Sequence, residues 1–571
     1  MNNKKLIKPY IRQFYRGNGW RFALGLAVTL VMTVSTMMMS WLIQVIIDMA
    51  TGADVGFSFK EVVTLTVLGV LLEAFAYLLA YHSKPKFVAK GIGQYKNYVF
   101  ERLCQKGIGA FSKENSSLYI SALSNDARTV EMNYLANVFV IVESSAICIG
   151  ALVLMFWYNP LLTVLSIVFA LLPLAVSICT GNLVAKAEKR VSDKDETYMS
   201  TLKDSLIGYT VIKSFRAEIQ MCRIFSDTVR EVTEAKTVRK KMSVLVSGLS
   251  TCSGTILQFG IFLIGAYMAL NGHGLSAGSV LVFVQLLNFV INPISAIPQA
   301  LAEIKASKAL IEKVAIALES NQRDEGAECK NQLTNGITLN NISFGYEEEK
   351  PVLHNVSFDF EAGKSYAIVG SSGSGKSTLL NLLMATHDGY TGSICYDDTE
   401  LRKIKSESLY EMVSVVQQNV FIFNASIRDN ITMFSDFPSD QVDRAIELSG
   451  LSGLINERGE DYLCGENGCG LSGGEKQRIS IARSLLKKSQ VLLVDEATAA
   501  LDPETAHQVS NAILDLNGLT RVVVTHALDE GLLKRYDCVL TLKNGSITES
   551  GSFDELMEKK GYFYSLFTVS Q

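Results

Sequence analysis

The sequence predicts two domains of different class, an α-helical membrane domain of six spans followed by an α/β domain. Long stretches without an ionisable side chain recur in the first part of the chain, whereas short β-branched segments alternate with helical ones in the last part. The formal net charge of −4 over 571 residues is unevenly divided. Residues 1–302 carry +10 and residues 303–571 carry −14. We expect two physically distinct parts, and nothing in this balance indicates a nucleic-acid partner.

Six apolar segments are each long enough to cross a bilayer core of about 30 Å as a helix, a structure that satisfies its own backbone in lipid. Two of them contain one carboxylate each, Glu73 and Glu143. An ionisable group within a span faces a cavity by default. The alternative, given equal weight, is a protonated carboxyl that hydrogen-bonds a neighbouring helix. The six segments are 22–47, 62–82, 134–158, 160–185, 242–272 and 274–302.

Basic residues set the expected orientation of the spans. Eight Lys or Arg fall in the connection 84–132 and thirteen in 186–241, whereas the connections on the other side contain one basic residue, Lys60. By the positive-inside rule, both termini and the two long connections lie in the cytoplasm. We expect an integral, multi-pass protein of a bacterial plasma membrane whose α/β domain is cytoplasmic.

The segment that begins at Gly370 has the form GxxxxGK[ST] and lies between a buried strand, 366–369, and a helix that starts at Thr378. Such glycines allow backbone N–H groups to close around phosphates, and the helix N-terminus adds positive potential. Lys376 would reach the β- and γ-phosphates of ATP, and the Ser377 hydroxyl would hold Mg²⁺. The predicted phosphate-binding residues are Gly370, Ser371, Ser372, Gly373, Ser374, Gly375, Lys376, Ser377 and Thr378.

Two more strands of this domain end at polar residues. The apolar run 491–494 leads into Asp495 and Glu496, and the run 522–525 leads into His526. A buried central strand would deliver Asp495 to Mg²⁺ near the phosphates. Glu496 would stand just past the strand end, where it can polarise an attacking water. A lone His is more often structural, but at the carboxyl end of a parallel strand His526 would face the ligand crevice.

The segment 471–478, Leu-Ser-Gly-Gly-Glu-Lys-Gln-Arg, resembles the signature motif of ATP-binding cassette (ABC) proteins. The order of P-loop, Gln418, signature, 491–496 and His526 is also similar to that family. Six spans followed by one cassette is the layout of an exporter-type ABC half-transporter, so the resemblance covers essentially the whole chain. It implies a membrane domain, a linker and an α/β P-loop nucleotide-binding domain at 1–320, 321–335 and 336–571.

The resemblance implies a role for each matching residue. Tyr346 would stack on adenine, although a core aromatic is its alternative. Gln418 would contact Mg²⁺ and sense the γ-phosphate, but Gln417 stands beside it and only spacing decides between them. Glu496 would be the catalytic base and His526 the switch histidine. ATP would be held between the P-loop of one cassette and three signature residues of a second, which are Ser472, Gly473 and Gly474.

A half-transporter implies a dimer, formed with another copy of the chain or with a related subunit. The segments 118–126 and 209–215 resemble coupling helices that contact the cassettes, and 4–18 resembles an elbow helix on the inner membrane surface. The implied function is ATP hydrolysis coupled to export of an amphipathic small molecule, lipid or peptide by alternating access. The alternative is import of a siderophore-like compound on the same fold. Glu73 and Glu143 would line the path and favour cationic or amphipathic cargo.

Overall fold

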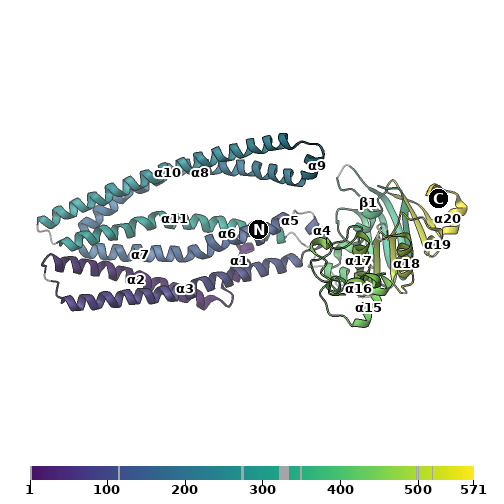
Figure 1. Ribbon diagram of the computed structural model, residues 1–571, viewed down its shortest axis with the longest axis horizontal. Coiled ribbons are helices and arrows are strands. Elements are labelled where there is room, and N and C mark those ends of the chain that lie inside the picture. Colours follow the sequence, from purple (N-terminus) through teal and green to yellow (C-terminus); the bar gives the residue numbers. More distant parts are fainter. Residues whose placement is uncertain are drawn as a thin grey trace. The chain divides into compact units, whose positions relative to one another are not determined.

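The computed structural model describes residues 3–53, 55–112, 116–271, 275–319, 333–347, 350–496, 498, 501–516 and 518–570. Its internal contacts divide the chain into two compact units (Figure 1). The membrane unit consists of Met1–Glu101 and Tyr119–Ile316, and the described part of it is helical. The cassette unit consists of Arg102–Leu118 and Ala317–Gln571, and it contains both sheets.

Long helices make up the membrane unit. Three of them, α3, α8 and α10, have 46, 48 and 53 residues, which is about 70–80 Å at 1.5 Å per residue. Each is therefore more than twice as long as a bilayer core is thick, and the long connections of the sequence are helical continuations of the spans. The elements are α1 (Asn3–Tyr15), α2 (Gly19–Ala50), α3 (Phe59–Cys104), α5 (Ser116–Leu123), α6 (Asn125–Val130), the π-helix η1 (Glu131–Leu135), α7 (Ala136–Tyr158), α8 (Pro160–Ile207), α9 (Tyr209–Ser214), α10 (Glu218–Leu270) and α11 (Ala277–Glu319).

Five helical segments of the described chain are long and apolar enough to cross a membrane. In α8 the apolar part identified among the described residues is Pro160–Leu172, which is shorter than a span. Most side chains between 173 and 185 lie outside the described residues, so the sixth span stays a prediction. The five segments are Gly19–Ala50, Phe59–Cys104, Leu118–Tyr158, Glu218–Leu270 and Ala277–Glu319.

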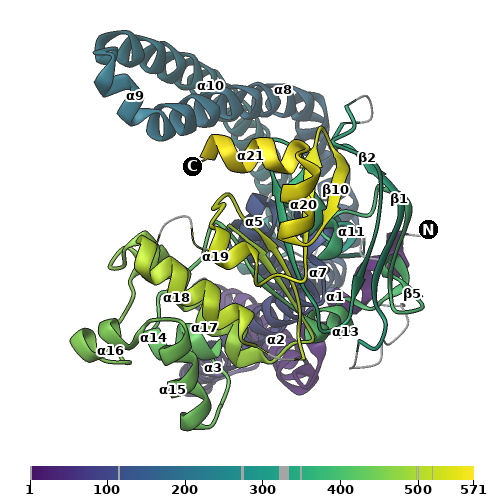
Figure 2. The same ribbon diagram turned by 90° about the vertical axis from the view of Figure 1, so that its right-hand side faces the viewer.

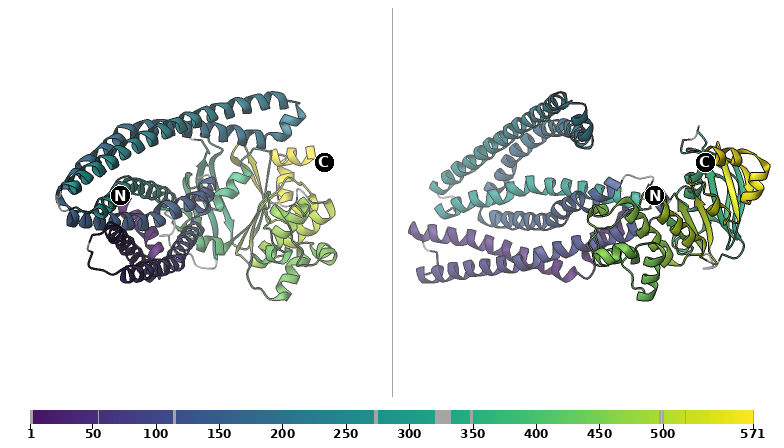
Figure 3. Two further views of the ribbon diagram at one scale, coloured as in Figure 1. Left: turned by 60° about the vertical axis from the view of Figure 1, so that its left-hand side comes forward. Right: turned by 45° about the vertical axis from the view of Figure 1, so that its right-hand side comes forward.

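The helices of the membrane unit pack unevenly along their length. Leu162 of α8, Leu257 of α10 and Phe283 of α11 are at most 1% exposed and belong to one apolar cluster. α8 and α10 continue side by side to α9, which joins them, and near α9 this pair stands apart from the other helices (Figure 3). Tyr209 and Val211 of α9 are each 59% exposed. One end of the hairpin is therefore fixed in a core, and the α9 end presents apolar side chains on its surface.

A buried carboxylate joins α2 to the start of α11. Asp48 is 4% exposed and accepts hydrogen bonds from the Gly278 backbone N–H at 2.8 Å and from the Ser276 hydroxyl at 2.7 Å. Gln44, one turn earlier, donates to the same carboxylate at 3.2 Å. A helix start leaves backbone N–H groups without partners inside the helix and favours negative charge. Asp48 thus caps α11 from a neighbouring helix.

The elbow helix α1 places its apolar face against protein. Tyr10 and Phe14 are buried, and the Phe14 ring packs on Tyr95 of α3 and Tyr134 of η1 at centroid distances of 5.5 and 5.4 Å. Asn18, which follows α1, is fully buried and donates to the Phe87 carbonyl at 2.9 Å. A helix is present in the expected segment, and its apolar side packs on the bundle.

The cassette unit contains two sheets. One has the order β2-β1-β4-β5 with antiparallel pairs, and the other has the order β10-β9-β3-β8-β7-β6, in which all pairs except β9–β10 are parallel. Parallel strands are buried on both faces, which explains the continuous apolar runs of the sequence. The strands are β1 (Gly336–Phe344), β2 (Leu353–Glu361), β3 (Ser365–Gly370), β4 (Thr391–Tyr396), β5 (Thr399–Glu400), β6 (Val413–Val416), β7 (Val491–Asp495), β8 (Thr520–Val524), β9 (Cys538–Lys543) and β10 (Ser546–Gly551).

One group of helices gathers beside these sheets. α14, α15 and α16 gather with α17 on one side, away from β1, β2 and β5 (Figure 2). The cassette helices are α12 (Lys376–Leu383), α13 (Ser406–Met412), α14 (Ile427–Thr432), α15 (Ser439–Leu448), α16 (Ser452–Arg458), α17 (Gly473–Lys487), α18 (Pro503–Leu514), α19 (Glu530–Leu533), α20 (Phe553–Lys559) and α21 (Tyr562–Ser570), with 3-10 turns η3 (Leu401–Lys403) and η4 (Glu466–Gly468).

The segment between α3 and α5 belongs to the cassette unit, which differs from the expectation for the first coupling helix. From Tyr119 onward, the expected segment 118–126 belongs to the membrane unit. The short helix α4 (Ile108–Ser112) instead packs on the cassette, because Gly109 lets it approach the Thr386 carbonyl: a Cβ there would lie 2.6 Å from that oxygen. Lys106 also donates to the Ala317 carbonyl at 2.6 Å. Most of the expected linker, 321–335, lies outside the described residues.

Candidate nucleotide site

The P-loop connects β3 to α12 in a conformation that requires glycine. Gly373 and Gly375 have φ of 77° and 100°, in the left-handed region that side chains disfavour. A Cβ on Gly375 would lie 2.7 Å from Leu353 Cδ2. Gly375 is also the N-cap of α12, so the loop ends on the free N–H groups of a helix. The backbone therefore forms the concave, positively polarised turn that binds phosphate.

Lys376 and Ser374 complete the phosphate cradle. Lys376 is 4% exposed, and its Nζ donates to the carbonyls of Gly370 and Ser371 at 2.9 and 3.0 Å. Burial lowers the pKa of Lys376, and the carboxylates of Glu496 and Asp495 oppose that shift. Ser374 Oγ is buried and has no hydrogen-bond partner in the described chain. A buried hydroxyl without a partner is costly, and an oxyanion in the loop would give it one.

Asp495 lies beside the P-loop at the end of β7. Its Oδ1 accepts a hydrogen bond from Ser377 Oγ at 3.0 Å. Burial raises the pKa of Asp495 above its ordinary value of 3.8, and the hydrogen bond from Ser377 opposes the shift. The Ser377 hydroxyl and the Asp495 carboxylate lie side by side, and both are hard oxygen ligands of the kind that Mg²⁺ prefers. The two residues fit the cation that the sequence predicts there.

Three side chains that are distant in sequence meet at Glu496. Gln418 Nε2 donates to Glu496 Oε2 at 2.8 Å, and His526 Nε2 lies 2.7 Å from Glu496 Oε1. Glu496 has φ of 50°, so the chain leaves the strand direction at this residue. Its N–H donates to the Val524 carbonyl of β8 at 3.1 Å, which fixes the turn. The structure brings Gln418 to this cluster, whereas Gln417 lines the pocket described below.

Tyr346 lies next to the P-loop helix. The side chain is 58% exposed, and its hydroxyl is 3.3 Å from Thr378 Oγ1. Its ring meets the Phe344 and His387 rings at centroid distances of 5.2 and 5.3 Å. The aromatic is thus on the surface of the cassette, as a base-stacking residue must be, and not in its core.

The signature residues lie at the start of α17, far in sequence from the P-loop and from Tyr346. Ser472 caps the helix: its hydroxyl accepts from the Glu475 N–H, and the Glu475 carboxylate accepts from the Ser472 N–H. Gly473 and Gly474 form the first turn. Within the described chain, no hydrogen bond joins these residues to the P-loop. They offer a second helix start for an anion.

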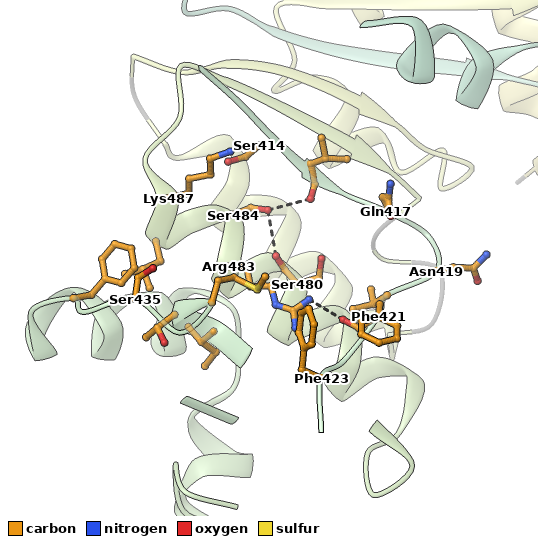
Figure 4. A pocket seen from close by; sticks show the side chains of 17 residues that line it. Ser414, Gln417, Asn419, Phe421, Phe423, Ser435, Ser480, Arg483, Ser484 and Lys487 are labelled. Atoms are coloured by element: carbon orange, nitrogen blue, oxygen red, sulfur yellow. Dashed lines mark hydrogen bonds between the residues drawn. The ribbon is translucent and has the colours of Figure 1, made fainter. Parts of the chain in front are cut away.

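A pocket of about 550 Å³ lies between β6, the segment after it, α14 and α17 (Figure 4). Arg483 of α17 reaches into its wall and donates to the Phe421 carbonyl at 2.8 Å and to the Asn430 side chain at 2.7 Å. The pocket includes Gln417, the neighbour of Gln418. The sequence assigned no role to Arg483, because nothing in local spacing shows which loop a helix residue will bind.

The two carboxylates within the spans have different surroundings. Glu143 Oε2 lies 3.7 Å from Lys84 Nζ, which belongs to α3. The Lys84 ammonium also lies 5.5 Å from the centre of the Phe139 ring. Glu73 is on the face of α3 that carries the buried Gly69 and Ala76, and Gly69 packs against Met38 and Met39 of α2. Glu143 is therefore one half of an ion pair, and Glu73 is half-buried on the same face of α3 as Gly69.

Fold and site together define a membrane protein of long helices with a fused P-loop ATPase. Comparison with known families agrees: the ABC transporter transmembrane region matches residues 22–294, and the ABC transporter domain matches residues 353–499. A β-(1→2)glucan export ATP-binding/permease protein, NdvA, of Rhizobium johnstonii is 33% identical over 72% of this chain and 70% of its own length. The chain belongs to the ABC transporter family. It binds ATP, and its ATPase activity is coupled to transport across a membrane.

Further similarity extends over the full length. The ATP-dependent lipid A-core flippase of Vibrio vulnificus is 28% identical over 99% of this chain and 97% of its own length. The solved structure of a bacterial Atm1-family ABC exporter with ATP bound has a TM-score of 0.84 at 22% identity, covering 96% of this chain and 99% of the other. The fused helical and α/β architecture predicted from the sequence is thus confirmed as the exporter-type fold.

Proposed function

We propose that the chain works as a dimer that exports an amphipathic, lipid-like molecule or a glycan across a bacterial plasma membrane, with the cassettes and both termini in the cytoplasm. The contact of Gln418 and His526 with Glu496, beside the P-loop, carries the ATPase part of this proposal. The relatives named as a flippase and as an export permease support outward movement. They do not favour the alternative of a siderophore-type importer.

Hydrolysis follows from the three side chains at Glu496. The Glu496 carboxylate takes a proton from the attacking water, and the Gln418 amide orients the carboxylate and the water. His526 holds the second oxygen of Glu496 through its Nε2. Lys376 moves from the loop carbonyls to the β- and γ-phosphates, which gives its buried ammonium a stronger partner.

Mg²⁺ would be held by Ser377, Asp495 and Gln418. The cation would neutralise negative charge that develops during phosphoryl transfer. Burial disfavours the ionised form of Asp495 in the free cassette, and a cation would restore it.

A dimer supplies what one cassette lacks. In the single chain, the P-loop offers phosphate contacts from one side only, and the α17 start with Ser472, Gly473 and Gly474 offers a second helix start for an anion. Two chains paired head to tail would place each α17 start over the other chain's P-loop. The partner is a second copy or a related half-transporter.

Coupling to the membrane would use surfaces on both units. α4 packs on its own cassette, and α9 presents the exposed Tyr209 and Val211, followed by the exposed Phe215. The pocket beside Gln417 is lined by both apolar and polar side chains, among them Phe421, Phe423, Arg483 and Lys487 (Figure 4). We assign this pocket to α9 of the second subunit, so that nucleotide-driven movement at Gln418 reaches the spans.

The substrate path would pass the two carboxylates of the spans. Glu73 remains a candidate for contact with cationic or amphipathic cargo, since it lies within a span, one turn from Gly69, which packs on the adaptable methionines of α2. Glu143 contributes there as an ion pair with Lys84 and not as an isolated charge. Together they make the path polar without a large net charge.

Reconstituted vesicles test the function. The purified chain in lipid should be a dimer, hydrolyse ATP, and move a fluorescent lipid-linked sugar into inside-out vesicles when ATP is outside. A Glu496→Gln chain, prepared in parallel, should bind ATP and move nothing. ATP-driven movement only in the opposite direction would establish import, and an inactive monomer that gains activity with a second, related chain would establish a heterodimer.

A further inference from the structure

The segment between α12 and β4 contacts the aromatic group beside the P-loop. His387 in this segment stacks on Phe344 at a centroid distance of 5.2 Å and an interplanar angle of 28°. Tyr346 meets both rings edge to face, at 79° to Phe344 and 90° to His387. His387 therefore supports the one aromatic of the three that is placed to stack on a base.

Tyr346 needs this support because it is largely in solvent. Its side chain is 58% exposed, and a free surface tyrosine has rotational freedom that it must lose to form a platform. The two ring contacts and the 3.3 Å approach of its hydroxyl to Thr378 Oγ1 define one orientation. Order that exists before binding reduces the entropy that ligand binding must remove.

The same segment carries the contact surface for α4. The Cβ position of Gly109 lies 2.6 Å from the Thr386 carbonyl and 3.1 Å from the Ala385 carbonyl. Glycine thus brings the α4 backbone directly onto the peptide units that precede His387. The three atoms nearest to this Cβ position are backbone atoms of 385 and 386, so a shift of α4 acts on this backbone.

Hydrogen bonds make the segment stiff. The Thr386 N–H and hydroxyl both donate to the Asn381 carbonyl of α12, at 3.1 and 2.7 Å. Tyr396 donates to the Leu383 carbonyl at 2.8 Å. At the other end, Arg402 lies over the Tyr390 ring at 4.3 Å and donates to its carbonyl. A short segment fixed at both ends moves as a unit.

We propose that His387 is a positioning residue that orients Tyr346 for adenine and links it, through the backbone of 385–386, to the docking of α4. Adenine stacking would then favour one position of α4, and α4 would in turn alter the affinity for ATP by the same factor. The inference rests on the proposed adenine contact of Tyr346. The link from Tyr346 through His387 to α4 differs from the γ-phosphate contacts at Gln418, because it responds to the presence of the base and not to the state of the phosphates.

The experiment compares ATP with inorganic tripolyphosphate on the full-length protein in lipid nanodiscs. Tripolyphosphate occupies the P-loop but has no base, so its inhibition constant reports the phosphate cradle alone. We expect His387→Ala to raise the KM for ATP about 3- to 10-fold, the range of one aromatic contact. The kcat and the tripolyphosphate inhibition constant should stay within about twofold, and His387→Phe should restore most of the loss because it keeps the stack on Phe344.

A double-mutant cycle tests the link to α4. Gly109→Ala should raise the KM for ATP in the otherwise unchanged chain and have little further effect in the His387→Ala chain. Gly93→Ala is the matched control, since no atom lies within 4 Å of its Cβ position on α3. Additive effects of Gly109→Ala and His387→Ala would overturn the link.

Other outcomes distinguish the positioning role of His387 from the adenine role of Tyr346 on which it rests. An unchanged KM in Tyr346→Ala would remove the adenine role of Tyr346 itself. A raised KM in Tyr346→Ala together with an unchanged KM in His387→Ala would overturn only the role of His387. Equal weakening of ATP and tripolyphosphate by His387→Ala would show a general structural effect and would also overturn it.

Discussion

Replacement of Gly278 by alanine should destabilise the membrane unit selectively. A Cβ at this position would lie 2.5 Å from Asp48 Oδ1 and 2.6 Å from the Gln44 carbonyl, where carbon and oxygen normally stay about 3.3 Å apart. The Gln44 carbonyl belongs to the backbone of α2, so it moves only with the whole helix. The Asp48 side chain must therefore turn away from the start of α11.

This rotation would break two hydrogen bonds of the Asp48 carboxylate. They are donated by the Gly278 N–H and the Ser276 hydroxyl, at 2.8 and 2.7 Å. Bonds to a charged group contribute about 1.5–3 kcal/mol each, and an overpacked site costs about 1–3 kcal/mol. Partial relaxation of the helices leaves about 3 kcal/mol, which corresponds to a fall in melting temperature of roughly 5 °C for a unit of about 300 residues.

Intrinsic tryptophan fluorescence gives an assay that is confined to the membrane unit. All three tryptophans of the chain, Trp20, Trp41 and Trp157, lie in α2 and α7. Thermal unfolding in nanodiscs followed by tryptophan emission therefore reports the membrane unit alone. Gly260→Ala in α10 is the control, because nothing lies within 4 Å of its Cβ position. If Gly278→Ala melts within about 1 °C of this control, Asp48 does not hold the two helices together as described.

Three further predictions concern the site and the spans. Glu496→Gln keeps the shape of the side chain but cannot accept the proton, so steady-state ATPase should fall about 10²- to 10⁴-fold with ATP binding retained; near-normal turnover would assign the base elsewhere. Because burial raises the pKa of Asp495, the folded cassette binds the proton more tightly than the unfolded chain, and its stability falls as pH rises from the ordinary value of 3.8 through the raised one. Asp495→Asn should thus stabilise the ATP- and Mg²⁺-free cassette at neutral pH, as measured by hydrogen exchange. This gain in stability should disappear below pH 3.8. Equal stability of the two chains at neutral pH would contradict the burial penalty. Glu143→Gln removes the carboxylate that pairs with Lys84, whereas Glu73→Gln changes a half-buried side chain on α3. Transport and substrate-stimulated ATPase should therefore change more in Glu143→Gln than in Glu73→Gln. Unchanged transport in both variants would remove these residues from the path.

Much of the fold was predictable because the signals are local. Charge-free stretches predict spans from the cost of burying ionised groups in lipid, and apolar runs that end in polar residues predict buried parallel strands. The P-loop was identified because its glycines, Lys376 and the helix start are adjacent in sequence, and the structure has the expected left-handed φ at Gly373 and Gly375. Contacts between distant segments had no such signal, and the docking of α4 through Gly109 is the example where expectation and structure differ.

The sequence by itself determined the two domains, the P-loop and the family motifs, since each depends on neighbouring residues or on composition along one segment. Only the tertiary structure decided which of two adjacent glutamines reaches Glu496, that Glu143 is paired with Lys84, and that Asp48 caps a helix that begins more than two hundred residues later. These choices depend on where separate helices and strands meet. A side chain binds whatever the packed fold places within about 3 Å of it, and that distance is fixed by the whole chain and not by any part of it.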